Sequence, residues 1–490
     1  MNLTRRFVLV NSLKVCAASP LLAYGASHAA AASALQREPL ATLPPSYREE
    51  SLAISDDAQS VAFAAGAGGS ERVVHDGQEG PVFSRCSNPV FAPTSKKLFY
   101  SVLDGSPGGR RLKIMADGTL IDTDFASEPE FFFSPDGKHW AASGSMVQQQ
   151  QGNTIRRGKV ILFVDGVEVG RYNDASAPTF SRDGNHVAFL ASDDDVTLIV
   201  DGKPETIFKS DPATRGQAIN PFVNGSAMDM AYQCKYLSDG SLLLLVPDGS
   251  SWTIYKGPKA IKSYAGNTIG GFGYRGISSA SVKSKDGIAG RSVVTALDSP
   301  VAIWWEKMEG DQAKRWRLVK DGQPIDDNLA TDWWSSQRPV ISNDGSRCGY
   351  VLWDDPDISA VINGTKSAPF KNVWGITLPS AAERGRFKSA FAASDGSEWS
   401  FVVNGTPDSA KFTSAYAPTI AIDGSHLVCR AKRDNSQWLV VDQVAVDGVQ
   451  NVISGPMFLN RSMQVNPAAP TNVIWVVQEG KELFRVTSSL

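Results

Sequence analysis

The chain has 490 residues, of which 42% are hydrophobic and 20% are charged. This composition is typical of folded globular proteins and excludes an intrinsically disordered chain. The formal net charge of -3 excludes the bulk positive field with which many proteins hold nucleic acid. The length allows two to four domains of about 100–200 residues each, or one large repeat architecture.

Residues 1–34 have the pattern of a bacterial export signal. Arg5 and Arg6 precede a moderately apolar stretch, and an alanine-rich run ends in Ala32-Ser33-Ala34, which fits an A-x-A cleavage site. The segment around the arginine pair resembles the twin-arginine export motif. No other stretch has the ~18 apolar residues of a membrane-spanning helix. The sequence therefore predicts that residues 1–34 are removed, and that the mature protein is periplasmic or secreted and has no transmembrane segment.

The rest of the chain repeats a short signature. The segment Phe-Ser-Pro-Asp-Gly-Lys followed by an apolar run, at residues 133–142, recurs at residues 180–189 and 341–351. Weaker copies lie near residues 57, 94, 239, 286, 384, 423 and 467. Successive copies are mostly 37–47 residues apart, with two longer steps. A second signature falls between these copies: an apolar pair followed by Asp-Gly or Asn-Gly, as at Asp165-Gly166, Asp201-Gly202 and Asn363-Gly364.

Both signatures predict tight turns. Asp-Gly and Asn-Gly between apolar runs favour two-residue β-hairpins, because both central residues of a type I′ turn need a positive φ. Each unit is therefore predicted to form four antiparallel strands, with one signature after the first strand and the other after the third. Units of about 40–50 residues with four strands are typical of an all-β propeller.

The number of blades remains open from the sequence alone. About ten units can be counted, which allows one ring of seven to ten blades or two smaller rings. Residues 51–490 would contain the repeats, and residues 35–50 would form a linker or a strand that closes the ring. Residues 211–232 are irregular and mark a long loop or a boundary.

The repeat, with its Phe-Ser-Pro-Asp-Gly-Lys turn and following Val-Ala-Phe, resembles the TolB-like, WD-repeat-like propeller repeat of bacterial exported proteins. The resemblance covers nearly all of the mature chain. It implies the propeller fold but no particular activity, because such propellers serve as docking platforms, receptors and enzyme scaffolds.

The histidines and cysteines follow the repeat. His139, His186 and His426 each stand three residues after a turn aspartate or its equivalent. Such positions lie on different blades, so we expect these side chains to be structural and predict no zinc site. Four cysteines outside the signal do not form a disulfide framework in so long a chain. The glycine pattern at residues 271–276 lacks the strand–helix context of a dinucleotide site, so the sequence predicts neither a metal nor a cofactor.

Ten of the twelve tryptophans divide into two sets. Trp252, Trp316, Trp399 and Trp438 occupy equivalent third-strand positions, where packing explains them. Another six do not follow this register, and five of these lie close together in the sequence: Trp304, Trp305, Trp333, Trp334 and Trp353. Aromatic side chains on loops can form a stacking platform for sugar rings or a protein partner. Packing between blades is the alternative explanation for these five residues.

The sequence thus predicts an exported β-propeller that acts as a binding scaffold for a protein, peptide or glycan, with the five tryptophans as candidate ligand-binding residues. No catalytic residues are assigned. The alternative is a propeller enzyme of the glycan lyase or glycosidase type, which would need carboxylates or a metal converging at the axial funnel. The oligomeric state is not predicted.

Overall fold

The computed structural model describes residues 35–490 except for residues 104–110, 147–149, 152–153, 156–157, 194, 210–232, 249–250, 266–267, 275–276, 285–286, 295–299, 308–315, 331–338, 343, 355–356, 380–384, 434–435, 447–450 and 460–469. The predicted export signal and the irregular segment 211–232 lie outside the described residues. Within the described part, no helix has the length and apolar character needed to cross a bilayer.

The described residues form ten antiparallel sheets of four to six strands and one separate hairpin. The first four sheets are β2 (Ala53–Ile54), β3 (Val61–Ala67), β4 (Ser70–His75) and β5 (Gln78–Glu79); β6 (Arg85–Cys86), β7 (Val90–Phe91), β8 (Leu98–Leu103), β9 (Leu112–Ala116) and β10 (Thr119–Phe125); β11 (Glu130–Phe133), β12 (Trp140–Ser145), β15 (Val160–Val164) and β16 (Val167–Tyr172); and β17 (Asp174–Ala175), β18 (Thr179–Phe180), β19 (Val187–Ser192), β20 (Val196–Val200) and β21 (Lys203–Phe208). The separate hairpin is β13 (Gln150–Gln151) and β14 (Thr154–Ile155).

The next five sheets are β22 (Gln233–Tyr236), β23 (Leu242–Asp248), β24 (Ser251–Lys256) and β25 (Lys259–Ala265); β26 (Thr268–Tyr274), β27 (Ile277–Ser284), β28 (Gly287–Val294), β29 (Ile303–Lys307), β30 (Trp316–Lys320) and β31 (Gln323–Ala330); β32 (Val340–Ile341), β33 (Cys348–Asp354), β34 (Asp357–Ile362) and β35 (Thr365–Lys366); β36 (Asn372–Thr377), β37 (Ala390–Ser394), β38 (Trp399–Val403) and β39 (Thr406–Pro407); and β40 (Ser414–Ala415), β41 (Thr419–Ile420), β42 (Leu427–Arg433), β43 (Ser436–Val441) and β44 (Val444–Val446). A final sheet contains β45 (Val452–Leu459), β46 (Asn472–Glu479), β47 (Glu482–Ser489) and β1 (Gln36–Thr42). One short 3-10 turn, η1 (Glu49–Ser51), precedes β2.

The predicted all-β fold of four-stranded antiparallel units is confirmed. The first signature connects the first and second strands of a unit, and the second signature connects the third and fourth. Asp201 and Gly202 have φ of 49° and 74°, as a type I′ turn requires. Gly184 and Gly345, in first-signature turns, also have positive φ, at 77° and 71°.

The unit predicted to begin near residue 286 differs from the prediction, because its sheet has six strands instead of four. Asp321 follows β30. Its backbone N–H donates to the carbonyl of Ala302, and its side-chain Oδ1 accepts the backbone N–H of Ala302, as in other second-signature turns. Strands β29 to β31 therefore correspond to the second to fourth strands of an ordinary unit, and β26–β27 is an added hairpin. Alternating apolar residues predict strands but do not show which unit they belong to.

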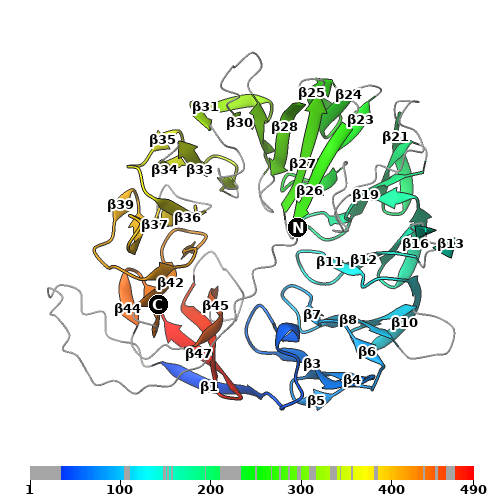
Figure 1. The fold of residues 1–490 in the computed structure, drawn as a ribbon, viewed down its shortest axis with the longest axis horizontal. Helices are drawn as coiled ribbons and strands as arrows, with labels where there is room; N and C mark the ends of the chain where they lie inside the picture. Colours follow the sequence, from blue (N-terminus) through cyan, green and yellow to red (C-terminus); the bar gives the residue numbers. More distant parts are fainter. Residues whose placement is uncertain are drawn as a thin grey trace.

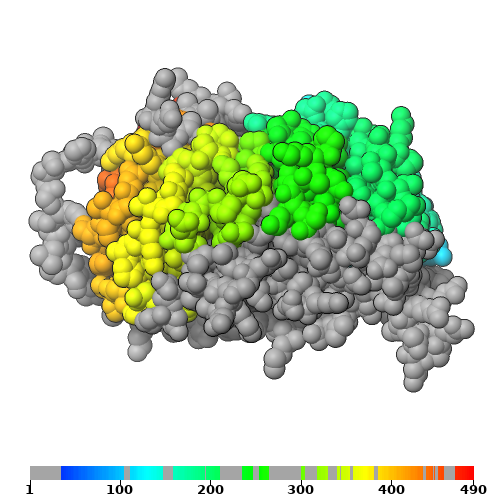
Figure 2. Space-filling view, turned by 90° about the horizontal axis from the view of Figure 1, so that it is seen from above, coloured from blue at the N-terminus to red at the C-terminus, as the bar shows by residue number. Residues whose placement is uncertain are grey.

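The sheets follow one another around a central opening, with first strands toward the opening and fourth strands outside (Figure 1). Seen from the edge, neighbouring sheets pack side by side along the rim (Figure 2). Their apolar faces meet in clusters that each join neighbouring sheets. This packing buries both faces of sheets that would be exposed alone.

The two ends of the described chain meet in the final sheet. Strand β1 pairs antiparallel with β47, and Glu38 lies opposite Arg485. A cluster containing Leu43, Phe63 and Leu483 joins this sheet to the β2–β5 sheet. Another cluster, containing the fully buried Trp475, joins it to the β40–β44 sheet. Residues 36–42, within the segment 35–50 that the sequence leaves open as a linker or closing strand, thus belong to the last sheet and lead into the first.

Candidate functional site

The five tryptophans predicted as a platform fall largely outside the description. Trp333 and Trp334 lie outside the described residues, and Trp304 and Trp305 lie on β29 with side chains that the structure does not describe. Trp353, on β33, is partly buried and packs against the cluster between the β32–β35 and β36–β39 sheets. Trp353 therefore takes part in sheet packing, and the five-residue platform stays a prediction.

The tryptophans assigned to packing behave as expected where they are described. Trp399 and Trp438 pack against the cluster between the β36–β39 and β40–β44 sheets. Trp252 and Trp316 lie on the third-strand equivalents β24 and β30, and their side chains are outside the description.

The histidines occupy one repeated structural arrangement. Nδ1 of His139 lies 2.7 Å from Asp165, and Nδ1 of His426 lies 2.7 Å from Asp442. His186 makes the same contact. Each aspartate belongs to a third-to-fourth-strand turn, and its other carboxylate oxygen accepts the backbone N–H of the residue after the histidine. The histidines therefore tie two turns of one sheet together, which agrees with the structural role expected from the sequence.

The first-signature aspartates serve the turns as well. The Ser181 hydroxyl donates to Asp183 Oδ1 at 2.5 Å and accepts the backbone N–H of His186 at 3.0 Å. Hydrogen bonds from Ser181 and then from Asn185 lower the pKa of Asp183 to about 2. The carboxylate is thus held ionised by the turn that it stabilises, which gives it no role as a proton donor at neutral pH.

One position on the first strand carries different side chains in different sheets. In the β6–β10 sheet this position is Ser87, whose backbone N–H donates to Ser101 and whose hydroxyl accepts the N–H of Ser101 at 2.8 Å. Ser176 makes the same pair of hydrogen bonds with Leu190 in the β17–β21 sheet. A serine here turns its side chain back onto the second strand and satisfies the backbone.

The β36–β39 and β40–β44 sheets carry aromatic residues at this position. The positions are matched by counting along each second strand from the third-to-fourth-strand turn. Trp374 lies opposite Ala392, and Tyr416 lies opposite Arg430. Both pairs match the pair formed by Ser87 and Ser101. Trp374 is 50% exposed, although it lies on β36, a first strand. Figure 1 shows β36 on the side of its sheet that faces the opening. An indole this exposed on an inner strand contributes little to packing and is available for contact.

Tyr416 supports an arginine from the neighbouring strand. The guanidinium of Arg430 lies over the Tyr416 ring, 4.1 Å from its centroid. Arg430 Nη1 donates to the carbonyl of Val452 at 3.3 Å, which reaches the final sheet. The next residue, Ile453 on the first strand β45, is 38% exposed. Trp374, Tyr416, Arg430 and Ile453, from three consecutive sheets, are called the aromatic wall below.

The inner strands approach each other closely within the wall. A Cβ atom added to Gly375 would lie 2.4 Å from the Cβ of Ala417, and Gly375 has a φ of 64°. Glycine is therefore needed there both for its backbone conformation and for space. The close approach places the strand that carries Trp374 beside the segment that carries Tyr416.

The sequence could have indicated Trp374, because it stands outside the register of the packing tryptophans. The predicted platform does not include it, because it lies apart from the other five tryptophans in the sequence. Tyr416 and Arg430 gave no signal, because their importance depends on which strands face each other.

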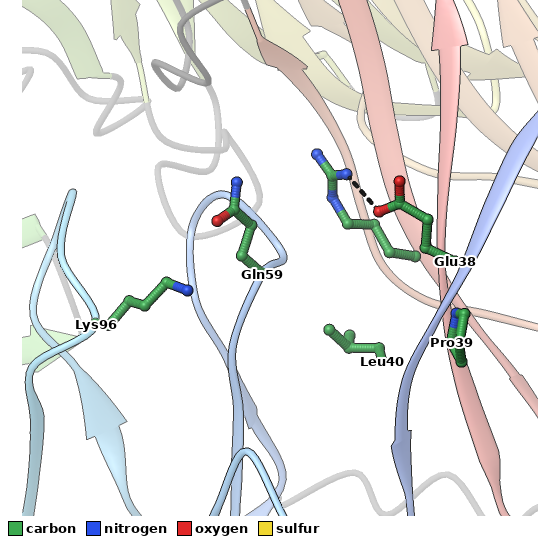
Figure 3. Close-up of a pocket in the computed structure, with 6 residues that line it drawn as sticks. Glu38, Pro39, Leu40, Gln59 and Lys96 are labelled. Atoms are coloured by element: carbon green, nitrogen blue, oxygen red, sulfur yellow. Dashed lines mark hydrogen bonds and ion pairs between the residues drawn. The ribbon is translucent and has the colours of Figure 1, made fainter.

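A cavity of about 440 Å³ lies between the final sheet and the first two sheets, lined by Glu38, Pro39, Leu40, Gln59, Lys96 and Arg485 (Figure 3). Arg485 is 8% exposed and donates to Glu38 at 3.1 Å. Figure 3 shows Lys96 and Gln59 on turns across from this ion pair. Because the charge of Glu38 balances that of Arg485, the lining favours no class of ligand strongly.

Metal and thiol chemistry have no support in the described part of the chain. There, no group of three or more His, Cys, Asp or Glu side chains is arranged to hold a metal ion. Cys86, Cys234, Cys348 and Cys429 are buried free thiols.

No family model matches the sequence, and no curated protein matches it either. Among solved structures, the chain is similar to one described as "Crystal structure of the eukaryotic initiation factor", with 9% sequence identity and a TM-score of 0.42. The similarity covers 87% of this chain and 93% of that one. Identity and structural agreement at this level support no inference about function.

Proposed function

We propose that the mature chain is an exported binding protein, a β-propeller scaffold whose ligand is a protein, peptide or glycan and contacts the aromatic wall. The observation that carries the proposal is the 50% exposure of Trp374 on an inner strand. At the equivalent position, two other sheets place serines that fold back onto the strand. A half-exposed indole offers a large aromatic face for contact with a ligand.

Three further features support a binding role. The wall combines an indole, a phenol, a guanidinium and an aliphatic side chain, the residue types that dominate binding hot spots. It is built on strands of packed sheets, which hold side chains more precisely than loops do. Export is supported by the arginine pair and the alanine-rich run of residues 1–34.

Binding is tested with the mature chain, residues 35–490, against panels of oligosaccharides and peptides, with thermal shift and calorimetry as readouts. A ligand that binds only the folded protein raises the melting temperature in proportion to its affinity and concentration. Trp374→Ala is expected to weaken a genuine wall ligand at least tenfold. Val444→Ala removes a 52% exposed side chain from the outer strand β44 of a neighbouring sheet and is the matched control.

Equal affinities of wild type and Trp374→Ala for every ligand found would reject the wall as the binding site. Export is tested separately by replacing Arg5 and Arg6 with lysine in the full chain. Retention of the precursor in the cytoplasm supports the twin-arginine route, and unchanged export of this variant refutes that route.

A further inference from the structure

We infer that the β32–β35 and β36–β39 sheets hold a site for the phosphate group of a phosphate monoester, formed by Arg347, Arg386 and Lys388. The site lies at the end of these sheets where the two signature turns meet, and it does not depend on the proposed function. Two neighbouring sheets depart from the repeat at this end, and both depart from it in the same way.

The first position of the third-to-fourth-strand turn is a carboxylate in most of the sheets. Six sheets have aspartate at this position: Asp76, Asp117, Asp165, Asp201, Asp321 and Asp442. The β32–β35 and β36–β39 sheets have Asn363 and Asn404 instead. The two amides therefore remove a negative charge from each of two adjacent sheets.

The residue that faces this position from the first-signature turn changes as well. In four of the sheets with aspartate it is a histidine or a lysine: His139, His186, His426 and Lys97. In the two departing sheets it is Arg347 and Lys388. The repeat accepts a lysine and an aspartate together, as Lys97 and Asp117 show, so the cations do not require the amides. Permanent cations thus lie where the carboxylates of the repeat are absent.

Hydrogen bonds hold the three cations in one unit. Nη1 of Arg347 donates to the carbonyl of Lys388 at 2.6 Å. Oδ1 of Asn404 accepts the backbone N–H of Lys388 at 2.6 Å, and its Nδ2 donates to the carbonyl of Arg386 at 2.9 Å. A carboxylate has no N–H for the second bond, so the amide both removes a charge and positions the segment. Phe387 is 1% exposed and anchors this segment, while the residues on either side of it are exposed.

The charge of the unit is not neutralised by an ion pair. Within the described part of the chain, no carboxylate forms a salt bridge with Arg347, Arg386 or Lys388. Burial lowers the pKa of the half-buried Arg347, and the charge of Asp344 opposes this effect only in part. A half-buried guanidinium beside two exposed cations attracts an anion with more than one charge, because little water screens it.

Two aspartates lie beside the unit, and both serve their own turns. The carboxylate of Asp344 accepts hydrogen bonds from the backbone and the hydroxyl of Ser346. Asp423, in the first-signature turn of the next sheet, accepts the same two bonds from Ser425. Neither carboxylate occupies the place of the aspartates that Asn363 and Asn404 replace.

A phosphate monoester matches three cations better than a carboxylate does. It carries a charge of about -1.5 to -2 at neutral pH and three strong acceptor oxygens, whereas a carboxylate has one charge and two oxygens. Guanidinium groups bind such oxygens in pairs, and an ammonium group adds a point charge. Because Phe387 is buried, the unit presents charge without an exposed aromatic face. It therefore recognises the phosphate group and not the rest of the ester.

The inference is tested by calorimetry at low ionic strength with the mature chain, residues 35–490. The probes are glucose 6-phosphate, inorganic phosphate, dimethyl phosphate and acetate. We expect glucose 6-phosphate to bind at least tenfold more tightly than dimethyl phosphate and acetate, which carry one charge each. Comparable binding of inorganic phosphate would agree with recognition of the phosphate group. Binding of inorganic phosphate alone would overturn the assignment of an ester.

Two variants test the residues. Lys388→Gln should weaken the binding of glucose 6-phosphate at least fivefold, because it removes one of the three cations. Asn363→Asp restores the carboxylate of the repeat beside Arg347 and should also weaken binding at least fivefold. Oδ1 of residue 363 can still accept the backbone N–H of Cys348, as aspartate does in other sheets, so this variant should fold like wild type.

Lys97→Gln is the matched control, because Lys97 occupies the position of Lys388 in the β6–β10 sheet, across the central opening (Figure 1). Its affinity for glucose 6-phosphate should stay within twofold of wild type. Melting temperatures establish that the variants are folded.

The inference is wrong if no phosphate probe binds, or if the probes with one charge bind as tightly as glucose 6-phosphate. It is also wrong if folded Asn363→Asp binds like wild type, or if Lys97→Gln weakens binding as much as Lys388→Gln. None of these results bears on the aromatic wall, which Trp374→Ala tests separately.

Discussion

Nδ1 of His186 lies 2.8 Å from Oδ2 of Asp201, while Oδ1 of the same carboxylate accepts the backbone N–H of Val187 at 2.9 Å. The carboxylate of Asp201 thus contacts the imidazole of His186 and also accepts a hydrogen bond from the strand that begins at Val187. The hydrogen bond to Asp201, and then the charge of this carboxylate, raise the pKa of His186. The protonated imidazole is therefore favoured in the folded state relative to the unfolded chain.

This shift gives a pH dependence of definite sign. Because the folded-state pKa of His186 is above the unfolded value of about 6.5, its stabilising contribution is fully present below that value. It is lost as pH rises through the folded-state pKa. The destabilisation caused by His186→Asn, measured by urea denaturation, should therefore be larger at pH 5.5 than at pH 8.5. Equal destabilisation at both values would show that the ion pair contributes nothing.

Closure through the final sheet makes Leu43 important for the whole chain. Leu43 is 1% exposed, directly follows β1, and packs with Phe63 and Leu483 between the first and last sheets. Leu43→Ala should reduce the free energy of unfolding by about 2–5 kcal/mol, as for other large-to-small core substitutions. Leu120→Ala, at a position 43% exposed on the outer strand β10, should change it by less than about 0.5 kcal/mol. Equal effects in urea titrations would contradict the role of this junction.

Except in the six-stranded sheet, the turns and the strand order could be predicted from the sequence because they depend on local chemistry. An Asp-Gly pair between apolar runs predicts a type I′ turn. The structure confirms the positive φ values at Asp201 and Gly202. The exception is Asp442-Gln443, where Gln443 has a φ of 68° at the position of the usual glycine. Contacts within the β40–β44 sheet hold this turn, so the local rule does not reveal it.

The aromatic wall could not be predicted, because it depends on which strands face the opening. Trp374 and Trp353 both depart from the register of the packing tryptophans. Trp353 packs between sheets and Trp374 is exposed, and only the three-dimensional arrangement distinguishes them. Arg430 likewise becomes notable only because pairing within the β40–β44 sheet places it over Tyr416.

The buried cysteines should be unreactive in the native protein. Burial is the main cause that raises the pKa of both Cys86 and Cys348 to about 12. The thiolate is the nucleophile, so at pH 8 native thiols have neither the charge nor the access needed for reaction. The mature chain should show almost no reaction with a disulfide reagent at pH 8, and four reactive thiols in concentrated urea. Rapid modification of any cysteine under native conditions would show that its sheet opens locally.

Alanine substitutions at Gly375 and Gly405 separate two costs of an added side chain. One cost is crowding between the inner strands, and the other is backbone strain at a positive φ. Gly375→Ala places a Cβ 2.4 Å from that of Ala417, at a φ of 64°. Gly405→Ala, in the same sheet, has a φ of 82° but no atom within 4 Å of the added Cβ. The Gly405 variant should lose about 1 kcal/mol of stability from strain alone. The Gly375 variant should lose about 1–3 kcal/mol more, because the inner strands must move apart.

The same movement has a functional consequence, because it separates Trp374 from the segment that carries Tyr416. Gly375→Ala should therefore weaken a wall ligand, whereas Gly405→Ala should bind it like wild type despite its lower stability. Urea denaturation measures the first difference and calorimetry the second. If the two variants lose equal stability and bind equally, the inner strands of these two sheets are not in contact, and Gly375 does not position Trp374.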